Sequence, residues 1–471
     1  MDDKKVYFHD TTFRDGVQAL WAMYVNNGMW EAVGPYIDKA GFKSVDVLPL
    51  APEWSVRWYQ EQPWKREELI GGIMQNTPII LPTLGMMGNL SQYWPVAMLR
   101  FYIQFTQKLY KGKIKHAMLI CPTRDELERE FHIMFPLMRA EGIEPVPYIT
   151  YANREWLTDE YYAHLMKTLT DTYKPKMFVL EDVDGLLTVE RAKTLLPVIL
   201  KNAGNMPIVL HAHGMNTLHE AVAVEAMKQG IRHFQTCIPP LSNGSSHLNV
   251  FNVCHNARVL GLEPCIDEEP LRVASERLTR IADEEGLAKG APQLYDESVY
   301  QTEVPGGVVA TLAHQLTFMG MGDRYDEVME EIPNIVKELG NPIMITPHSQ
   351  YIVTQAAMNV AMGRWVEFPD TMIEYAMGVY GVGDTNLAGM DQNLKDKLLS
   401  DHRAKAIAEN WSNYLERRET ETLEEIKAKF GMEGGSDEDF FLRVRYISAA
   451  EQEAAKSFPP PKTYSFPNEA N

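Results

Sequence analysis

Long apolar runs are missing from this chain of 471 residues. No stretch approaches the roughly 18–20 consecutive apolar residues that a membrane-spanning helix needs, so no direct membrane span is predicted. Cysteine is also scarce, and its four residues form no Cys-x-x-Cys pair: Cys121, Cys237, Cys254 and Cys265. A chain of this size buries a large core without disulfides, and its first residues lack signal-peptide character. We therefore expect a cytoplasmic protein.

Basic residues are fewer than acidic residues in this chain. The chain has 45 Lys and Arg against 64 Asp and Glu, a formal net charge of −19. A strongly acidic protein repels phosphate backbones and anionic lipid surfaces, which excludes nucleic-acid binding as its main function. With 45% hydrophobic and 23% charged residues, the composition is otherwise that of an ordinary globular protein.

Eight short apolar runs alternate with longer helical patterns in the first 290 residues. The runs lie at 5–10, 44–50, 77–84, 115–121, 144–150, 176–182, 206–213 and 233–238. They show little polar–apolar alternation, which is typical of parallel strands buried on both faces. Eight such units predict an α/β fold, a (β/α)8 TIM barrel over residues 1–290. The alternative, an open doubly wound sheet, requires a Gly-rich phosphate loop that the sequence does not contain.

The remainder of the chain has a different pattern. Residues 291–455 are predicted to form a mostly helical C-terminal region that caps the barrel mouth, because helical periodicity recurs at 308–322, 324–340, 351–365 and 399–418. Residues 456–471 are rich in proline and polar residues, so we expect an extended or loosely attached tail.

Polar residues gather where the predicted strands end, which in a TIM barrel is the active-site face. The sharpest pattern is His211-x-His213, since residues i and i+2 of a strand point to the same face. With Asp15 after the first strand and Glu181 on the sixth, these imidazoles predict a divalent metal site. Mixed nitrogen and oxygen ligands are compatible with Zn, Mn or Co. The alternative is a pair of structural or solvent-facing histidines.

Three further residues have two interpretations each. Arg14 can bind a carboxylate or an enolate-like oxygen through its guanidinium fork, or it can form an internal salt bridge. Ser245 can shuttle a proton or be an ordinary turn serine. Asp10 is either a site residue or a cap of the first loop. No adjacent base can be read from the sequence, so a serine-nucleophile triad is not predicted.

The segment HDTTFRDGVQAL (9–20) resembles the DTTxRDxxQS signature of the biotin-dependent carboxyltransferases. That family includes the carboxyltransferase domain of pyruvate carboxylase, the alpha subunit of oxaloacetate decarboxylase and the central metal-binding subunit of transcarboxylase. LEDVDGLL (180–187) and LHAHGMNTLHEA (210–221) resemble its strand-6 and strand-7 motifs, and residues 299–315 and 345–363 resemble its helical region. The resemblance runs in order to about residue 400 and marks the chain as a divergent member.

The resemblance implies transfer of a carboxyl group between carboxybiotin on a separate carrier and a small-molecule acceptor, with a divalent metal polarising the acceptor carbonyl. The metal ligands that it implies are Asp15, His211 and His213. The active-site arginine and glutamine of the family fall on Arg14 and Gln18. The hydroxyl thought to relay a proton to and from biotin falls on Ser245, which is therefore the implied biotin contact.

The chain departs from the family pattern at one metal ligand and at the residues that would contact the substrate. The metal-ligating carboxylated lysine is replaced by Glu181, which offers a carboxylate on a shorter arm. Where the family has a substrate-binding arginine, this chain has Gly85. Where the family has an aspartate after the fourth strand, it has Cys121. The histidine of the first-strand signature is replaced by Val17. The candidate substrate contacts are thus Arg14, Gly85 and Cys121, and the missing arginine argues against pyruvate or oxaloacetate. We expect an acceptor with an amide, ester, thioester or apolar group.

No lysine lies in the Ala-Met-Lys-Met context of a biotin attachment segment. The resemblance therefore implies a biotin carrier protein and a biotin carboxylase or decarboxylase subunit on other chains, in a multi-subunit complex in which this chain forms a homo-oligomer. Two alternatives stay open. One is a biotin-independent metal-dependent lyase or condensing enzyme that uses enolate chemistry. The other is a non-catalytic scaffold subunit of a carboxylase complex.

Overall fold

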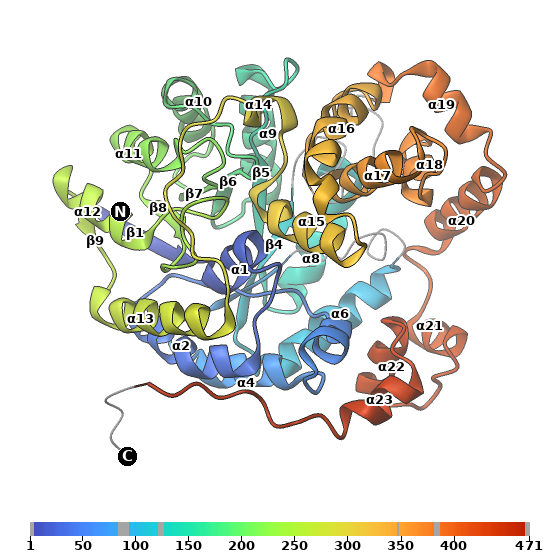
Figure 1. Cartoon of the computed structure of the whole chain (residues 1–471), viewed down its shortest axis with the longest axis horizontal. Coiled ribbons are helices and arrows are strands. Elements are labelled where there is room, and N and C mark those ends of the chain that lie inside the picture. Colours follow the sequence, from blue (N-terminus) through green and yellow to red (C-terminus); the bar gives the residue numbers. More distant parts are fainter. Residues whose placement is uncertain (1–3, 83–93, 121–126, 346–347, 381–386, 467–471) are drawn as a thin grey trace.

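A parallel barrel forms the amino-terminal part of the computed structural model, which describes residues 4–82, 94–120, 127–345, 348–380 and 387–466 (Figure 1). Each of the eight predicted runs overlaps one strand, which confirms the TIM barrel. The strands are β1 (Lys5–Asp10), β2 (Val45–Asp46), β3 (Ile79–Leu81), β4 (Ile114–Ile120), β5 (Glu144–Thr150), β6 (Phe178–Asp182), β7 (Ile208–Ala212) and β8 (His233–Thr236).

The barrel closes at its first strand. The strands pair in chain order from β2 to β8, and β8 pairs in parallel with β1. Asp10 at the end of β1 is in register with Thr236 of β8 and with Val45 of β2. The carboxyl ends of these strands therefore lie on one rim of the barrel. A short ninth strand, β9 (Glu263–Pro264), adds to the start of β1 and was not predicted.

Helices surround the barrel, and most follow the strand that precedes them in sequence. Asparagine or threonine side chains cap several of them, as in α2, α9 and α10, which satisfies backbone N–H groups of the first turn. The barrel helices are α1 (Val17–Leu20), α2 (Asn27–Ala40), α3 (Pro52–Trp54), α4 (Lys65–Ile73), α6 (Val96–Leu109), α8 (His132–Ala140), α9 (Asp159–Thr168), α10 (Val189–Asn202), α11 (His219–Gln229), α12 (Val250–Val259) and α13 (Glu268–Glu285).

The C-terminal region is helical, as predicted, and it contributes to two hydrophobic cores. Residues between 304 and 407 form a core of their own, whereas apolar residues between 426 and 455 join the barrel core. Its helices are α14 (Val299–Thr302), α15 (Gly306–Phe318), α16 (Tyr325–Glu338), α17 (His348–Met362), α18 (Asp370–Ala376), α19 (Gln392–Leu399), α20 (Ala404–Arg417), α21 (Leu423–Lys429), α22 (Asp437–Val444) and α23 (Ala449–Ala455).

Helix α15 connects the C-terminal region to the barrel mouth. It packs against α1, and the Gly306 N–H at its start donates to the Val183 carbonyl after β6 at 3.0 Å. In Figure 1, α15 lies beside α1, and α16 to α18 extend outward from it. Helix α15 thus contacts the barrel mouth, and a cap formed by the whole of residues 291–455 stays a prediction.

The proline-rich tail is extended over its described part and crosses the outside of the barrel (Figure 1). The Asn26 side-chain amide donates to the Tyr464 hydroxyl at 2.8 Å, and that hydroxyl lies 2.8 Å from Glu285 Oε1. Lys462 also forms an ion pair with Glu285. The tail therefore contacts residues near the barrel mouth. None of the helices within the described ranges is long and apolar enough to cross a membrane.

The packing of α22 on the barrel core can be tested at Phe441. Its ring is fully buried and lies against Trp64, Trp94 and Tyr102. We expect Phe441→Ala to lower the free energy of unfolding by about 3–5 kcal/mol, because the cavity remains after the ring is removed. Denaturant unfolding measures this change. The control is Tyr446→Ala, whose side chain is 71% exposed; equal small effects of both changes would contradict this packing.

Candidate functional site

The turn after β1 places Arg14 and Asp15 at the barrel mouth. It is a π-helical turn (Thr12–Gly16) in which the Thr11 hydroxyl donates to Asp15 Oδ2 at 2.8 Å and the Asp15 N–H donates to the Thr11 carbonyl at 3.0 Å. The Arg14 guanidinium forms an ion pair with the other carboxylate oxygen, and both residues are buried. The Asp15 carboxylate is therefore held from two sides.

The end of β7 carries the two predicted histidines, each held in one tautomer. His211 Nδ1 lies 2.6 Å from Gln235 Oε1, a carbonyl oxygen that only accepts, so Nδ1 carries the hydrogen. His213 Nδ1 donates in the same way to the Ser245 backbone carbonyl at 2.8 Å. In both rings Nε2 keeps its lone pair, and hydrogen bonds of this kind from the other ring nitrogen are typical of metal-ligating histidine.

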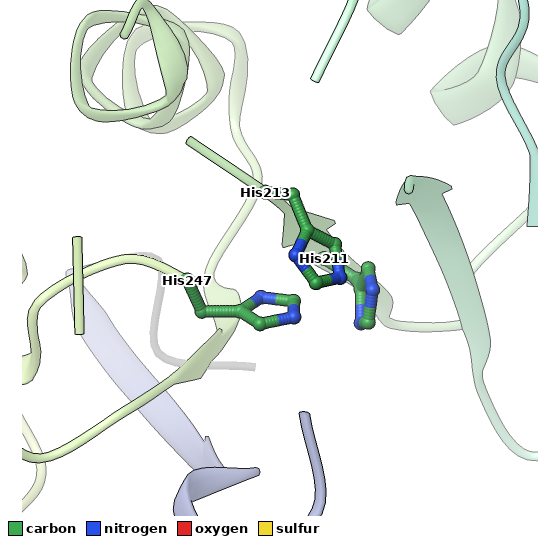
Figure 2. A group of neighbouring side chains, drawn as sticks. All are labelled: His211, His213 and His247. Carbon is green, nitrogen blue, oxygen red and sulfur yellow. The ribbon is translucent and has the colours of Figure 1, made fainter. Parts of the chain in front are cut away.

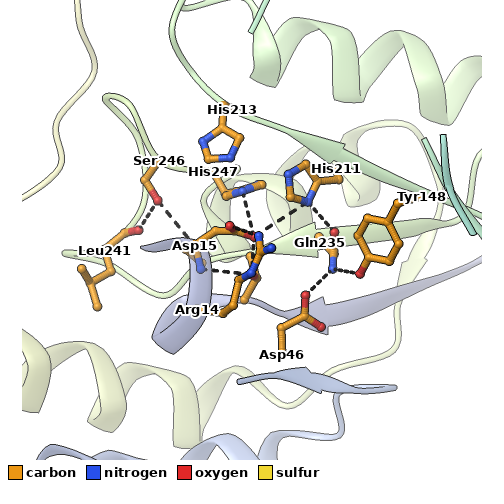
Figure 3. Close-up of polar contacts among 12 residues, drawn as sticks. Arg14, Asp15, Asp46, Tyr148, His211, His213, Gln235, Leu241, Ser246 and His247 are labelled. Carbon is orange, nitrogen blue, oxygen red and sulfur yellow. Dashed lines mark hydrogen bonds and ion pairs between the residues drawn. The ribbon is translucent and has the colours of Figure 1, made fainter. Parts of the chain in front are cut away.

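Gln235 on β8 is itself fixed by buried partners. Its side-chain nitrogen donates to Asp46 Oδ2 at 2.8 Å and to the Tyr148 hydroxyl at 3.0 Å, as Figure 3 shows. These two acceptors turn the amide so that its carbonyl oxygen faces His211. Four strands, β2, β5, β7 and β8, thus contribute to the orientation of one imidazole ring.

A third imidazole, His247, completes the cluster shown in Figure 2. One nitrogen of each of the three histidines lies within 4.8 Å of the others, and all three residues are buried. The residue comes from the segment after β8, whose backbone forms an antiparallel bridge between His247 and His213. His247 Nε2 lies 3.5 Å from Asp15 Oδ2. The cluster therefore joins the residues of the first turn to those of β7.

Burial keeps two of these imidazoles neutral. Burial, reinforced by neighbouring His247, holds the pKa of His211 well below its usual value and lowers the pKa of His213 to about 3. Burial acts in the opposite direction on Asp15, but the Arg14 guanidinium beside it holds the pKa of this carboxyl well below its usual value. Two neutral imidazoles and a carboxylate anion therefore converge, and such donors bind divalent transition metals.

The ring nitrogens of the cluster fit a bound cation. His211 Nε2 and His247 Nδ1 are buried and have no hydrogen-bond partner within the described parts of the chain, while His247 Nε2 faces the Asp15 carboxylate. An unsatisfied buried polar atom costs about 1–3 kcal/mol. Ligation of a cation by the Nε2 lone pairs would remove that cost. The donor set suits zinc, manganese or cobalt and does not distinguish among them.

Glu181 lies beside the cluster, on β6 in register with His211. Its Oε1 accepts a hydrogen bond from the Thr150 hydroxyl at 2.7 Å, and burial raises its pKa to about 7. Glu181 lines the same small cavity as Arg14 and Asp15. Its role as a metal ligand stays a prediction, since the group of close ligand atoms is made of the three histidines.

Gln18 and Arg14 both line the small cavity beside the cluster. Gly307 lies across from Gln18, and a Cβ at Gly307 would come 2.8 Å from Gln18 Nε2. At Gly306 a Cβ would come 2.5 Å from His213 Nδ1. The Pro-Gly-Gly turn at the start of α15 therefore packs directly on the histidine cluster, where only glycine fits.

Ser245 is buried between the cluster and α1. Its hydroxyl donates to the Ala19 carbonyl at 3.0 Å, and its own carbonyl accepts from His213. Asp10 accepts a hydrogen bond from the Thr12 hydroxyl at 2.6 Å, as expected of a residue that caps the first loop.

Two predicted substrate contacts, Gly85 and Cys121, lie outside the described residues, so their positions remain predictions. Val17 is fully buried in α1. His247 ends the polar segment after strand 8 that was expected at the barrel mouth, but it was not predicted as a metal ligand, and Gln235 was not predicted at all. Gln235 lies in the eighth strand and His247 in the loop after it. A single glutamine in a strand, or a single histidine in a polar loop, does not by itself indicate a functional site.

If a metal binds at the histidine cluster, the histidines are its ligands. With zinc as the probe, we expect His211→Ala and His247→Ala each to weaken binding by at least about tenfold, because each removes a ligand atom. Competition with a chromophoric chelator measures the affinity. The control is His402→Ala, whose side chain is 88% exposed.

The same titration shows whether Glu181 is a metal ligand in addition to Asp15 and the histidines. A comparable loss in Glu181→Gln would make Glu181 a ligand. Unchanged affinity in Glu181→Gln would leave Asp15 and the histidines, whereas unchanged affinity in His247→Ala would contradict the cluster as the metal site.

The orientation of His211 can be tested through its partner. We expect Gln235→Leu to weaken zinc binding about 10–100-fold, the usual effect of removing the group that orients a ligating histidine. The surface change Gln104→Leu on α6 serves as the matched control. An affinity equal to that of the unchanged protein would show that the ring holds its orientation without Gln235.

Comparisons with known proteins agree with the fold and the sequence motifs. A family model described as a conserved carboxylase domain matches residues 299–459. A pyruvate carboxylase subunit of Methanocaldococcus jannaschii is 26% identical over 377 residues, which cover 79% of this chain and 65% of that protein. The 2-oxoglutarate carboxylase large subunit of Hydrogenobacter thermophilus is 25% identical, with coverage of 80% and 58%. The chain thus spans about 65% or less of these relatives' lengths.

Two further matches cover more of their own chains. The methylmalonyl-CoA carboxyltransferase 5S subunit of Propionibacterium freudenreichii subsp. shermanii is 26% identical over 81% of this chain and 74% of its own length. The solved carboxyl transferase domain of Rhizobium etli pyruvate carboxylase with pyruvate and biocytin superposes with a TM-score of 0.78 at 20% identity, covering 98% of this chain and 79% of that one. At that identity the superposition supports the fold alone. Taken together, the matches show that this chain is similar in sequence to carboxylase and carboxyltransferase subunits over about four fifths of its length.

Proposed function

We propose that this chain is the metal-dependent carboxyltransferase component of a biotin-dependent carboxylase or decarboxylase. It would move a carboxyl group between carboxybiotin, presented by a separate carrier chain, and a small-molecule acceptor that is not pyruvate. The observation that carries the proposal is the cluster of three buried histidines next to Asp15 and Arg14, onto which the carboxylase-like turn at Gly306 packs.

The histidines and Asp15 would hold the metal. A divalent metal bound there supplies a Lewis acid that polarises the acceptor carbonyl. Gln235 and the Ser245 carbonyl keep the ligating rings in the tautomer that offers Nε2. Leaving the buried Nε2 of His211 without a partner costs free energy, and that cost favours a binding site over a packing feature.

Arg14 and Gln18 would act on the acceptor itself. Both line the small cavity at the cluster and the larger cleft outside it. The Arg14 guanidinium is paired with Asp15, so its charge is fixed at the cavity, where an acceptor oxygen gains negative charge as its α-carbon becomes nucleophilic. The Gln18 amide can donate to the same ligand. Burial and ion pairing keep the position of Arg14 unchanged during such a step.

Ser245 is proposed as the contact for biotin. Its hydroxyl hydrogen is held by the Ala19 carbonyl, so its oxygen can accept a hydrogen bond from a ureido N–H. Proton transfer through this residue would require the hydroxyl to turn from Ala19 toward the ligand.

The partners follow from the same proposal. The relatives are themselves named as subunits, among them a large subunit and a 5S subunit, which indicates that those proteins work in assemblies. For this chain we propose a biotin carrier protein, a biotin carboxylase or decarboxylase subunit and a homo-oligomeric state. Its location in the cytoplasm is proposed on the low cysteine content.

A half-reaction that does not need the acceptor tests the function. Free biotin carboxylated with labelled bicarbonate by a separate biotin carboxylase serves as the substrate, and loss of label is followed over time. We expect the chain loaded with Zn, Mn or Co to accelerate the loss at least about tenfold over its chelator-treated form. His211→Ala and Asp15→Ala should show the background rate, and His402→Ala the full rate.

Each other outcome favours a named alternative. A full rate in His211→Ala would overturn the proposed site. Bound metal without loss of label would favour a biotin-independent lyase or condensing enzyme. Neither bound metal nor loss of label would favour a scaffold subunit.

A further inference from the structure

A large cleft opens outward from the histidine cluster. It has a volume of about 1240 Å³ and lies between the barrel mouth and helices α15, α17 and α18. Arg14 and Gln18 line both this cleft and the small cavity at the cluster, so the two spaces meet at these residues. A ligand whose reacting end lies at the cluster would therefore extend its remaining atoms into the cleft.

We propose that this cleft binds the body of the acceptor, and that the acceptor is a molecule without net charge that carries an aromatic or similarly flat apolar group. This inference rests on the proposed function, because it assigns the substrate class of the same site. Three features carry it: the aromatic wall of the cleft, the pairing of its arginines and its size.

Five aromatic side chains from two short segments form one wall of the cleft: Trp21, Tyr24, Trp54, Trp58 and Tyr59. Trp54 and Trp58 stack with an interplanar angle of 9°, and Trp58 is 60% exposed although it is a large apolar residue. Aromatic faces exposed in a concave site bind flat apolar groups through area burial and ring stacking.

Three of the five aromatic side chains bind their polar groups within the protein. The Trp21 indole N–H donates to the Ala288 carbonyl at 2.7 Å, and the Tyr59 hydroxyl donates to the Met23 carbonyl. The Tyr24 hydroxyl accepts from the Asn26 amide at 3.3 Å. Since these hydrogen bonds are made within the chain, these three side chains offer a ligand mainly carbon surface.

The positive charges at the cleft are already balanced. Among the described residues that line it are three arginines, each paired with a carboxylate: Arg14 with Asp15, Arg57 with Glu451, and Arg445 with Glu53. An acceptor carboxylate in the cleft would have to compete with these pairs, which lowers the electrostatic gain from binding it there. A neutral acceptor avoids that competition.

The size of the cleft supports the same conclusion. Its volume exceeds the range of about 300–1000 Å³ that is usual for sites that bury a drug-sized ligand. A three-carbon oxo acid would leave most of the aromatic wall in water. A larger apolar body would cover that wall, at about 25 cal/mol for each Å² of apolar surface removed from water.

A matched pair of probes tests the substrate class. Pyruvate and acetophenone are both methyl ketones, and they differ in carrying a carboxylate or a phenyl ring next to the carbonyl. Isothermal titration calorimetry on the manganese-loaded full chain measures their affinities, with acetone as the probe that lacks both groups. We expect acetophenone to bind at least about tenfold more tightly than pyruvate, since ring burial stabilises only the former.

Substitutions in the aromatic wall test whether the wall causes the expected preference for acetophenone over pyruvate. We expect Trp54→Ala and Trp58→Ala to weaken acetophenone binding at least about fivefold and to leave pyruvate binding unchanged. Trp58 is mostly exposed, so its removal leaves the core intact. Trp411→Ala, on α20 and away from the cleft, is the tryptophan control and should change neither affinity. Equal or tighter binding of pyruvate, or equal effects of the wall variants on both probes, would overturn the proposal.

The two experiments distinguish a failure of the proposed acceptor class from a failure of the proposed carboxyl transfer. Label loss from carboxybiotin together with tighter binding of pyruvate would overturn the acceptor class and leave the proposed function in place. The expected preference for acetophenone without label loss would support the aromatic site and overturn carboxyl transfer as its use.

Discussion

The site depends on two hydrogen bonds that set the tautomers of His211 and His213. Each ring donates from Nδ1 to a carbonyl oxygen, one on Gln235 and one on the backbone of Ser245. A neutral imidazole has one donor and one acceptor nitrogen, so these bonds leave both Nε2 lone pairs facing the cluster. Without them the same residues would be buried histidines with no defined ligand atom. Burial alone keeps the rings neutral but does not orient them.

The strands and the paired histidines could be predicted from the sequence because both are local patterns. A parallel strand buried on both faces is a short apolar run, and all eight runs overlap a strand. His211 and His213 share a face because residues two apart in a strand always do. Closure of the barrel then brings Asp15 to the same rim, since β1 pairs with β8. For these elements the topology follows from the count of strands.

The third histidine could not be predicted, because a loop decides its position. The Gly214 N–H donates to the Ser246 carbonyl at 2.8 Å, and this backbone pairing turns His247 toward β7. A Cβ at Gly214 would lie 2.5 Å from the Gly244 carbonyl, so the close approach of the two loops requires glycine. Such a contact between distant segments leaves no periodic signal in the sequence. The division of the helical region between two cores is non-local in the same way.

The histidine cluster and the aromatic wall of the cleft come from different parts of the chain. The histidines and Glu181 belong to β6, β7 and the segment after β8, whereas the aromatic wall comes from residues 21–24 and 54–59, with α17 across the cleft. Arg14 and Gln18, between the two, touch both. The wall can therefore differ from that of a pyruvate-binding site without any change in the hydrogen bonds that orient the imidazoles. Residues on one side of the mouth can therefore change while the hydrogen bonds of the histidine cluster stay the same.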